Sequence, residues 1–87
     1  MADDSLVVKA VYDYIKDNCR SLAHSVNMGD VSVNSQSDII IITLQLEDDA
    51  IDYFESNGID DDILNYLGNN FCESFKITYE SKGSTPV

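Results

Sequence analysis

Apolar residues recur along the first part of the chain with the period of a helix. They return every three or four positions while charged residues occupy the opposite side, and Asp4 or Ser5 can cap the start. This pattern predicts an amphipathic helix over residues 5–23. The residues on its apolar side are Val8, Val11, Ile15, Cys19 and Leu22.

The segment after Gly29 changes to the period of two that is typical of strands. Val31 and Val33 alternate with polar residues, and after the polar stretch 34–37 a second apolar run covers residues 38–46. A polar stretch between two such runs indicates a turn. The two segments therefore predict a β-hairpin.

A short helix is expected directly after the hairpin. Asp48 or Asp49 can open it, and Asn57-Gly58 can stop it. Its apolar side consists of Ala50, Ile51 and Phe54.

A further helix and a last strand complete the pattern. Ile59 and Leu64 stand on either side of Asp60 as a hydrophobic staple would, so we expect Asp60 to cap a helix that ends at Gly68. The last strand is predicted from alternation between apolar and polar residues. Its apolar positions are Phe75, Ile77 and Tyr79.

The predicted element order is α-β-β-α-α-β, which is of the α+β class. We expect a two-layer sandwich with a small three-stranded, mainly antiparallel sheet, because the hairpin pairs in that sense. Residues 1–80 are predicted to form a single acidic domain, and residues 81–87 a flexible tail.

This element order resembles that of a type II KH domain over residues 5–80. The resemblance implies a nucleic-acid-binding module that grips the backbone with a GxxG loop between its paired helices. At that junction this chain reads Ser56-Asn57-Gly58-Ile59, followed by three aspartates, with one glycine instead of two. Such a loop would repel phosphate, so a degenerate KH-like ribosome-associated factor is one alternative for the function.

The strand over residues 38–46 is apolar on both faces. Four consecutive isoleucines put Ile40 and Ile42 on one face and Ile39 and Ile41 on the other. Apolar residues on both faces of a strand indicate cover on both sides. We therefore expect Ile39 and Ile41 to form a homodimer interface; the alternative is that a twisted sheet shelters them under the first helix or the tail.

Charge is distributed very unevenly along the sequence. The net charge is −11, and residues 21–75 hold eleven of the sixteen acids and no lysine or arginine. Such a field excludes nucleic acid and anionic membrane as direct partners and favours a basic surface. The residues predicted to bind that partner are Asp48, Asp49, Asp52, Glu55, Asp60, Asp61 and Asp62.

Helix starts can account for part of this acidity. Carboxylates in a first helical turn interact favourably with the helix dipole, and both Asp48 and Asp60 stand near predicted starts. However, Asp48, Asp52 and Glu55 follow each other at helical spacing, where like charges repel. Helix starts also do not explain the absence of lysine and arginine from the same stretch.

Motifs for catalysis or for a cofactor are absent from the sequence. The single histidine, His24, is expected to interact with carbonyl groups at the end of the first helix, and Cys19 falls on the apolar side of that helix. The acids do not fit a calcium-binding loop in either frame, started at Asp48 or at Asp60. We expect no enzyme activity, no cofactor, no metal site and no catalytic residue, with Cys19 and Cys72 as reduced thiols.

The expected location is the cytoplasm. No apolar run approaches the roughly 18 residues of a membrane span, and the first residues lack the pattern of a signal peptide.

In size, acidity and lack of catalytic motifs, the chain is similar to the DNA-mimic inhibitors that phages and mobile elements encode. That similarity implies a basic nucleic-acid-binding protein as the partner and a blocked DNA or RNA site as the outcome. The alternative of a different class is a dimeric interaction or adaptor module without catalytic activity.

Overall fold

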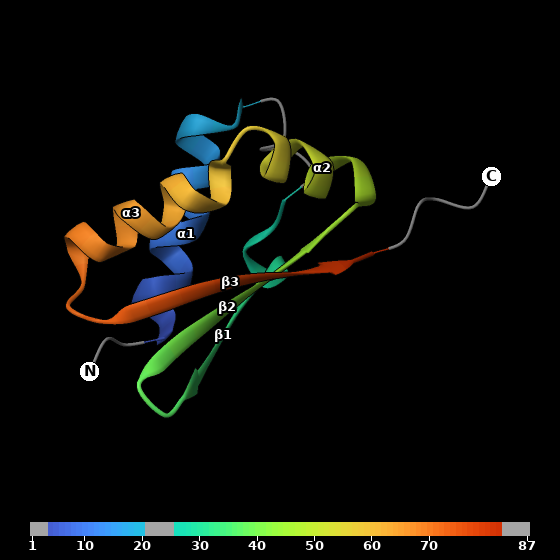
Figure 1. The fold of residues 1–87 in the computed structure, drawn as a ribbon. Coiled ribbons are helices and arrows are strands. Elements are labelled where there is room, and N and C mark those ends of the chain that lie inside the picture. The colour runs from blue at the N-terminus through green and yellow to red at the C-terminus, as the bar shows by residue number, and fades with distance from the viewer. Residues whose placement is uncertain (1–3, 21–25, 83–87) are drawn as a thin grey trace.

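The computed structural model describes residues 4–20 and 26–82, and it confirms the predicted element order and the α+β class (Figure 1). A short 3-10 turn, η2, precedes the hairpin. The elements are α1 (Asp4–Asn18), η2 (Met28–Asp30), β1 (Val31–Gln36), β2 (Ile39–Leu46), α2 (Asp48–Ser56), α3 (Ile59–Asn70) and β3 (Ser74–Ser81).

The sheet has the strand order β1-β2-β3, with β2 in the centre. β1 pairs with β2 in the antiparallel sense and β3 pairs with β2 in the parallel sense, so the sheet is mixed. The parallel pair arises because α2 and α3 together carry the chain back to the end of the sheet at which β2 begins. Ile42 lies between Val33 on one side and Ile77 on the other.

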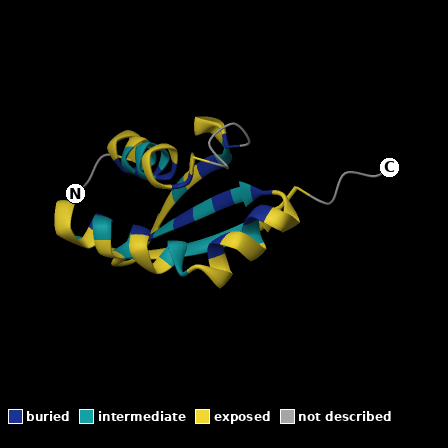
Figure 2. Cartoon of the chain, turned by 90° about the horizontal axis from the view of Figure 1, so that it is seen from above, coloured by how far each residue is buried: buried dark blue, intermediate teal, exposed yellow. Residues whose placement is uncertain are grey.

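Side chains on one face of β2 form the centre of the core. Burial alternates along this strand, and Ile42 and Leu44 are fully buried. Figure 2 shows this alternation as dark and light bands on the strand. All three helices add residues to the same core, so they lie on one face of the sheet as a second layer. The helical core residues include Val7, Val11, Ile15, Phe54, Ile63 and Leu67.

The hairpin turn is tighter than the polar stretch 34–37 suggested. β1 continues to Gln36, which pairs with Ile39, and only Ser37 and Asp38 form the turn. Ser37 adopts the left-handed region with φ 53°, which a two-residue hairpin requires. Polar residues extend the strand here because β1 is an edge strand whose outer face stays exposed.

The first helix is shorter than predicted. It ends at Asn18, whose side-chain amide donates to the carbonyl of Tyr14 at 3.0 Å. Cys19 is buried as expected. The predicted positions Leu22 and His24 lie outside the described residues.

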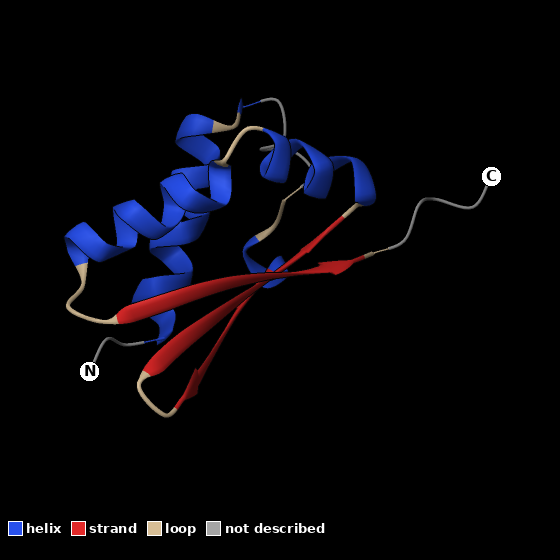
Figure 3. Ribbon diagram, in the orientation of Figure 1, coloured by secondary structure: helices blue, strands red, loops and turns tan. Residues whose placement is uncertain are grey.

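The junction between α2 and α3 differs from the prediction in its caps. α2 begins at Asp48, and Glu47 occupies the position before it without a capping hydrogen bond from its side chain. Gly58, with φ 64°, occupies the cap position of α3, so Asp60 lies inside the first turn and is not the cap. Figure 3 shows the short loop that joins these two helices. Only Asn57 and Gly58 separate the two helices, and the left-handed conformation of Gly58 lets the chain turn from α2 into α3 over that short distance. α3 then runs two residues beyond Gly68, to Asn70.

Phe54 provides a direct measure of how much this core contributes. Its side chain is fully buried, whereas the neighbouring Tyr53 is 40% exposed. Replacing Phe54 with Ala should lower the free energy of unfolding by about 3–5 kcal/mol, because it removes a large apolar side chain and leaves a cavity. Urea denaturation followed by circular dichroism measures this change.

Tyr53→Ala is the matched control. It removes a ring of similar size from the same helix and should cost no more than about 1 kcal/mol. Equal losses from the two substitutions would mean that Phe54 does not occupy the core as described.

Candidate functional site

The seven acids predicted to bind a partner lie on two consecutive helices. We call this set the acidic cluster: Asp48, Asp49, Asp52, Glu55, Asp60, Asp61 and Asp62. The first four belong to α2 and the last three to the first turn of α3. Six of them are exposed and Asp60 is half-buried, so their carboxylates are accessible from solvent.

None of the acidic cluster forms an ion pair within the described part of the chain. The two ion pairs there join Lys9 to Asp13 at 2.7 Å and Lys82 to Asp30 at 2.9 Å. Lys16 lies over the ring of Tyr12, 5.3 Å from its centroid. The negative charge of the cluster is therefore not compensated by these cations.

The pair between Lys82 and Asp30 was not apparent from the sequence, because 52 positions separate the two residues. Asp30 precedes β1 and Lys82 follows β3, so the pair joins the two edge strands. Burial of Asp30 opposes ionisation, but the hydrogen bond from the Asn27 N–H and the nearby Lys82 outweigh it and lower the pKa of Asp30. Asp30 belongs to the stretch 21–75 that contains no lysine or arginine, and it is thus neutralised by a lysine that lies outside that stretch.

The acidic cluster extends in two directions from α3. The charge of Asp62 raises the pKa of Tyr14 and of Cys19, in both cases after the larger effect of burial, so Asp62 lies within electrostatic reach of these two residues. Asp60 and Glu55 instead act on Tyr79 of β3. Asp60, Asp61 and Asp62 are consecutive in α3 and so project in different directions around its axis, and the seven acids therefore do not form a single stripe.

Two positions of α2 differ in how well they suit their place in the helix. Asp48 lies in the first turn, where the dipole favours an acid, and its carboxylate accepts a hydrogen bond from the hydroxyl of Ser81. Glu55 lies in the last turn, which holds no basic residue and where the dipole disfavours an acid. Asp48 thus has a structural partner, whereas the position of Glu55 costs stability.

Tyr79 is a residue near the cluster that the sequence did not single out. Its hydroxyl oxygen is buried and makes no hydrogen bond within the described residues. Burial raises the pKa of Tyr79, and the charges of Asp60, Glu55 and Asp61 raise it further. Asp60 is close enough to affect this pKa without accepting a well-formed hydrogen bond. The only sequence signal was alternation along the strand, which places Tyr79 on the core side.

The junction of α2 and α3 is the place where a KH domain would hold nucleic acid. Here Gly58 is followed by the half-buried Ile59 and then by three carboxylates, and the Asp60 carboxylate accepts a hydrogen bond from the Asp61 N–H at 2.8 Å. Negative charge at this turn opposes contact with phosphate.

A second candidate surface is the face of the sheet opposite the helices, which we call the open sheet face. Its residues follow from the strand alternation and register, and Thr43 and Thr78 share a hydrogen bond across it at 3.1 Å. Ile39 is 44% exposed there and Ile41 is half-buried. The face comprises Ser32, Asn34, Gln36, Ile39, Ile41, Thr43, Gln45, Ser74, Lys76, Thr78 and Glu80.

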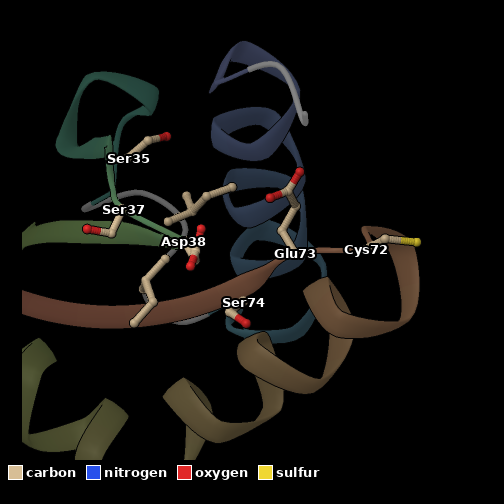
Figure 4. Close-up of a pocket in the computed structure, with 8 residues that line it drawn as sticks. Ser35, Ser37, Asp38, Cys72, Glu73 and Ser74 are labelled. Carbon is tan, nitrogen blue, oxygen red and sulfur yellow. The ribbon is translucent and has the colours of Figure 1, made fainter.

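A hollow of about 440 Å³ lies at one end of the sheet, where the hairpin turn meets the segment before β3. Asp38, Glu73 and three serines supply its polar lining, and Cys72 borders it with its sulfur directed away (Figure 4). Both cysteines are free thiols, Cys72 exposed and Cys19 buried. The lining holds carboxylates and hydroxyls but no basic side chain.

Three further findings bear on what this surface can do. Within residues 4–20 and 26–82, no helix has the length and apolar character needed to cross a membrane. In the same residues no group of three or more His, Cys, Asp or Glu side chains is arranged to hold a metal ion. No protein-family model, curated protein or solved structure matches the chain.

Lysine at two positions of the acidic cluster should stabilise the fold. Asp52→Lys and Glu55→Lys each relieve repulsion between like charges, and lysine at position 55 also suits the last turn of α2. We expect each substitution to raise the free energy of unfolding by about 0.3–1 kcal/mol. Moderate salt should raise the melting temperature of the unmodified protein for the same reason.

The control for this experiment is Asp48→Lys, which removes the acceptor for Ser81 and places a cation in a first helical turn. It should lower stability. A strong loss of stability from Asp52→Lys or Glu55→Lys in thermal melts would show that these acids have structural partners.

Removal of the Tyr79 hydroxyl should increase stability, more so in alkali. A buried hydroxyl without a partner costs free energy, so Tyr79→Phe should gain up to about 1 kcal/mol at pH 7. The raised pKa means that the folded chain retains a proton that the unfolded chain releases above pH 10 or so. Release of that proton stabilises the unfolded chain, so the unmodified protein keeps its stability below that pH and loses stability as the pH rises further. Tyr79→Phe has no proton to release and avoids this loss.

Denaturant unfolding of Tyr79→Phe at pH 7 and near pH 10.5 tests this prediction. The difference from the unmodified protein should widen at the higher pH. Tyr53→Phe, at an exposed position, should change stability by less than about 0.5 kcal/mol. A loss of stability from Tyr79→Phe at both values would mean that the hydroxyl has a hydrogen-bond partner.

Proposed function

We propose that this protein binds a basic nucleic-acid-binding protein and blocks the site at which that protein holds DNA or RNA. It would act as a DNA-mimic inhibitor of the kind that phages and mobile elements encode, inside the cell where its target works. The observation that carries the proposal is the acidic cluster, whose seven accessible carboxylates have no cationic partner within the described residues.

The spacing of these carboxylates supports the proposal. Asp48, Asp52 and Glu55 lie one turn apart along α2, with about 5–6 Å between successive Cβ atoms. This separation is roughly that of neighbouring phosphates along a strand. A groove lined by lysine and arginine would attract such a row as it attracts a nucleic acid.

The rigidity of the two helices also supports it. Phe54 anchors α2 in the core, and Ile63 and Leu67 anchor α3. The acids are therefore held in place before any partner arrives, so that binding does not have to order them. The spread of the cluster on two sides of α3 would let it follow a curved basic groove.

A dimeric adaptor module remains a second candidate because of the exposed Ile39 on the open sheet face. The two functions respond differently to salt. Binding through carboxylates weakens steeply as salt rises, whereas binding through apolar surface does not.

The test begins with a pull-down from host lysate in low and high salt, which supplies a candidate target. The purified candidate is then loaded with fluorescently labelled DNA or RNA, and this protein is titrated against the complex while anisotropy is measured. Mimicry requires displacement of the nucleic acid. If the target holds both ligands at the same time, the proposed mechanism is wrong.

Substitutions within the cluster should weaken the competition more than an equal change of charge elsewhere. We expect the triple change Asp52→Asn, Glu55→Gln and Asp61→Asn to raise the Kd for the target about tenfold or more, because the local field is lost. Asp48 is omitted because Ser81 donates to it.

The matched control neutralises three acids of α1, Asp4, Asp13 and Asp17. It changes the net charge by the same amount, and Asp13 already pairs with Lys9, so the Kd should change by less than about threefold. Equal losses of affinity from the two triple variants would mean that only the net charge of the protein matters for binding. No loss from either would favour the adaptor function.

A further inference from the structure

The open sheet face has no helix over it within the described residues, because all three helices lie on the other side of the sheet (Figure 1). It nevertheless carries apolar side chains in its centre strand. Ile39 is 44% exposed, and Ile41 is the next residue along the same face. The flanking strands contribute uncharged polar groups for the most part.

Charge distinguishes this face from the rest of the molecule. The chain has a net charge of −11, yet the open sheet face contains one cation, Lys76, and one acid, Glu80. At its end, Asp30 and Lys82 neutralise each other. The residues of the open sheet face therefore carry no net charge between them, and the carboxylates of Asp38 and Glu73 border the face only at its Ile39 end.

We infer that two copies of this chain associate through their open sheet faces, with a two-fold axis that runs along β2. Such an axis sets each of Ile39 and Ile41 against its own counterpart in the second copy. A symmetric interface of this kind needs a surface that is complementary to itself.

The strand register makes the face self-complementary. Asn34 of β1 and Lys76 of β3 both lie level with Ile41, on opposite sides of it. The axis exchanges the two edge strands, so Lys76 of each copy faces Asn34 of the other, whose side-chain oxygen can accept a hydrogen bond. Lys76 is therefore not placed against a like charge.

A second copy suits this face better than a basic target does. A basic protein would be drawn to the acidic cluster on the helical layer, and the open sheet face has no excess charge with which to compete for it. This inference is therefore independent of the proposed function, and both surfaces can be occupied at once.

The size of the face sets the expected strength. Strands of up to eight residues in a three-stranded sheet cover about 26 Å by 14 Å, or roughly 370 Å² of flat area. Stable complexes bury about 800 Å² on each partner. The dimer therefore belongs to the weak class and has to be sought from about 10 µM to about 1 mM.

Sedimentation equilibrium over that range, in low and high salt, tests the inference. The mass should rise toward twice the 9.7 kDa chain with concentration. Added salt should strengthen the dimer, because it screens repulsion between two acidic molecules, whereas the same salt should weaken binding to a basic target. A monomer at every concentration in high salt would overturn the inference.

Substitution of the two isoleucines should separate the copies. We expect Ile39→Thr with Ile41→Thr to raise the dimer Kd about tenfold or more, while threonine keeps the branched shape that suits a strand. Leu6→Thr is the control, since Leu6 is 57% exposed on α1, and it should leave the Kd unchanged. Circular dichroism verifies that the variants fold, and a dimer that survives the double change contradicts the interface.

Crosslinking provides a test that does not depend on weakening the fold. In a Cys72→Ser background, Ile41→Cys places one thiol near the two-fold axis, and packed sheets lie about 10 Å apart. A bismaleimide of similar reach should join two copies through residue 41. Crosslinking through Leu6→Cys at the same rate would mean that the contact is random collision and would overturn the proposed axis.

Discussion

The buried face of β2 is the part of the molecule on which every other element depends. β2 pairs with both other strands, and its Ile42 and Leu44 side chains contact a core to which all three helices contribute. Because side chains alternate across a strand, a shift of one residue in register would move this entire row to the other face. The tight turn at Ser37 and the parallel pairing with β3 set the register of β2, and they therefore also determine which of its side chains enter the core beneath the helices.

The core also explains how so acidic a chain remains folded. The residues of the acidic cluster all lie outside it, and those at the two helix starts gain from the helix dipoles. The repulsion that remains is a surface effect of a few tenths of a kcal/mol for each pair. Burial of side chains such as Phe54 and Leu67 contributes far more. The fold can thus carry a field that helps binding, at a tolerable loss of stability.

Local periodicity was enough to predict the helices and strands, because the apolar side of each element packs into the same core. Details that depend on partners distant in the sequence were not accessible. The pairing of Asp30 with Lys82 and the position of Tyr79 beneath carboxylates of two helices arise only when the sheet is assembled. The start of α3 differs from the prediction because the left-handed Gly58, and not Asp60, occupies its cap position. The acidic cluster was found as a set, but its division between the sides facing α1 and β3 needed the placement of α3.

The late position of β3 has a consequence for the growing chain during synthesis. β2 gains its parallel neighbour only after α2 and α3 have been made, so one edge of Ile39–Leu46 stays open in the meantime. A long apolar strand with an open edge is a site of aggregation between unfinished chains. We expect the acids that follow it directly, from Glu47 onward, to act as charged gatekeepers during that interval. The same carboxylates that give the finished protein its surface field would thus keep nascent chains apart until the sheet closes.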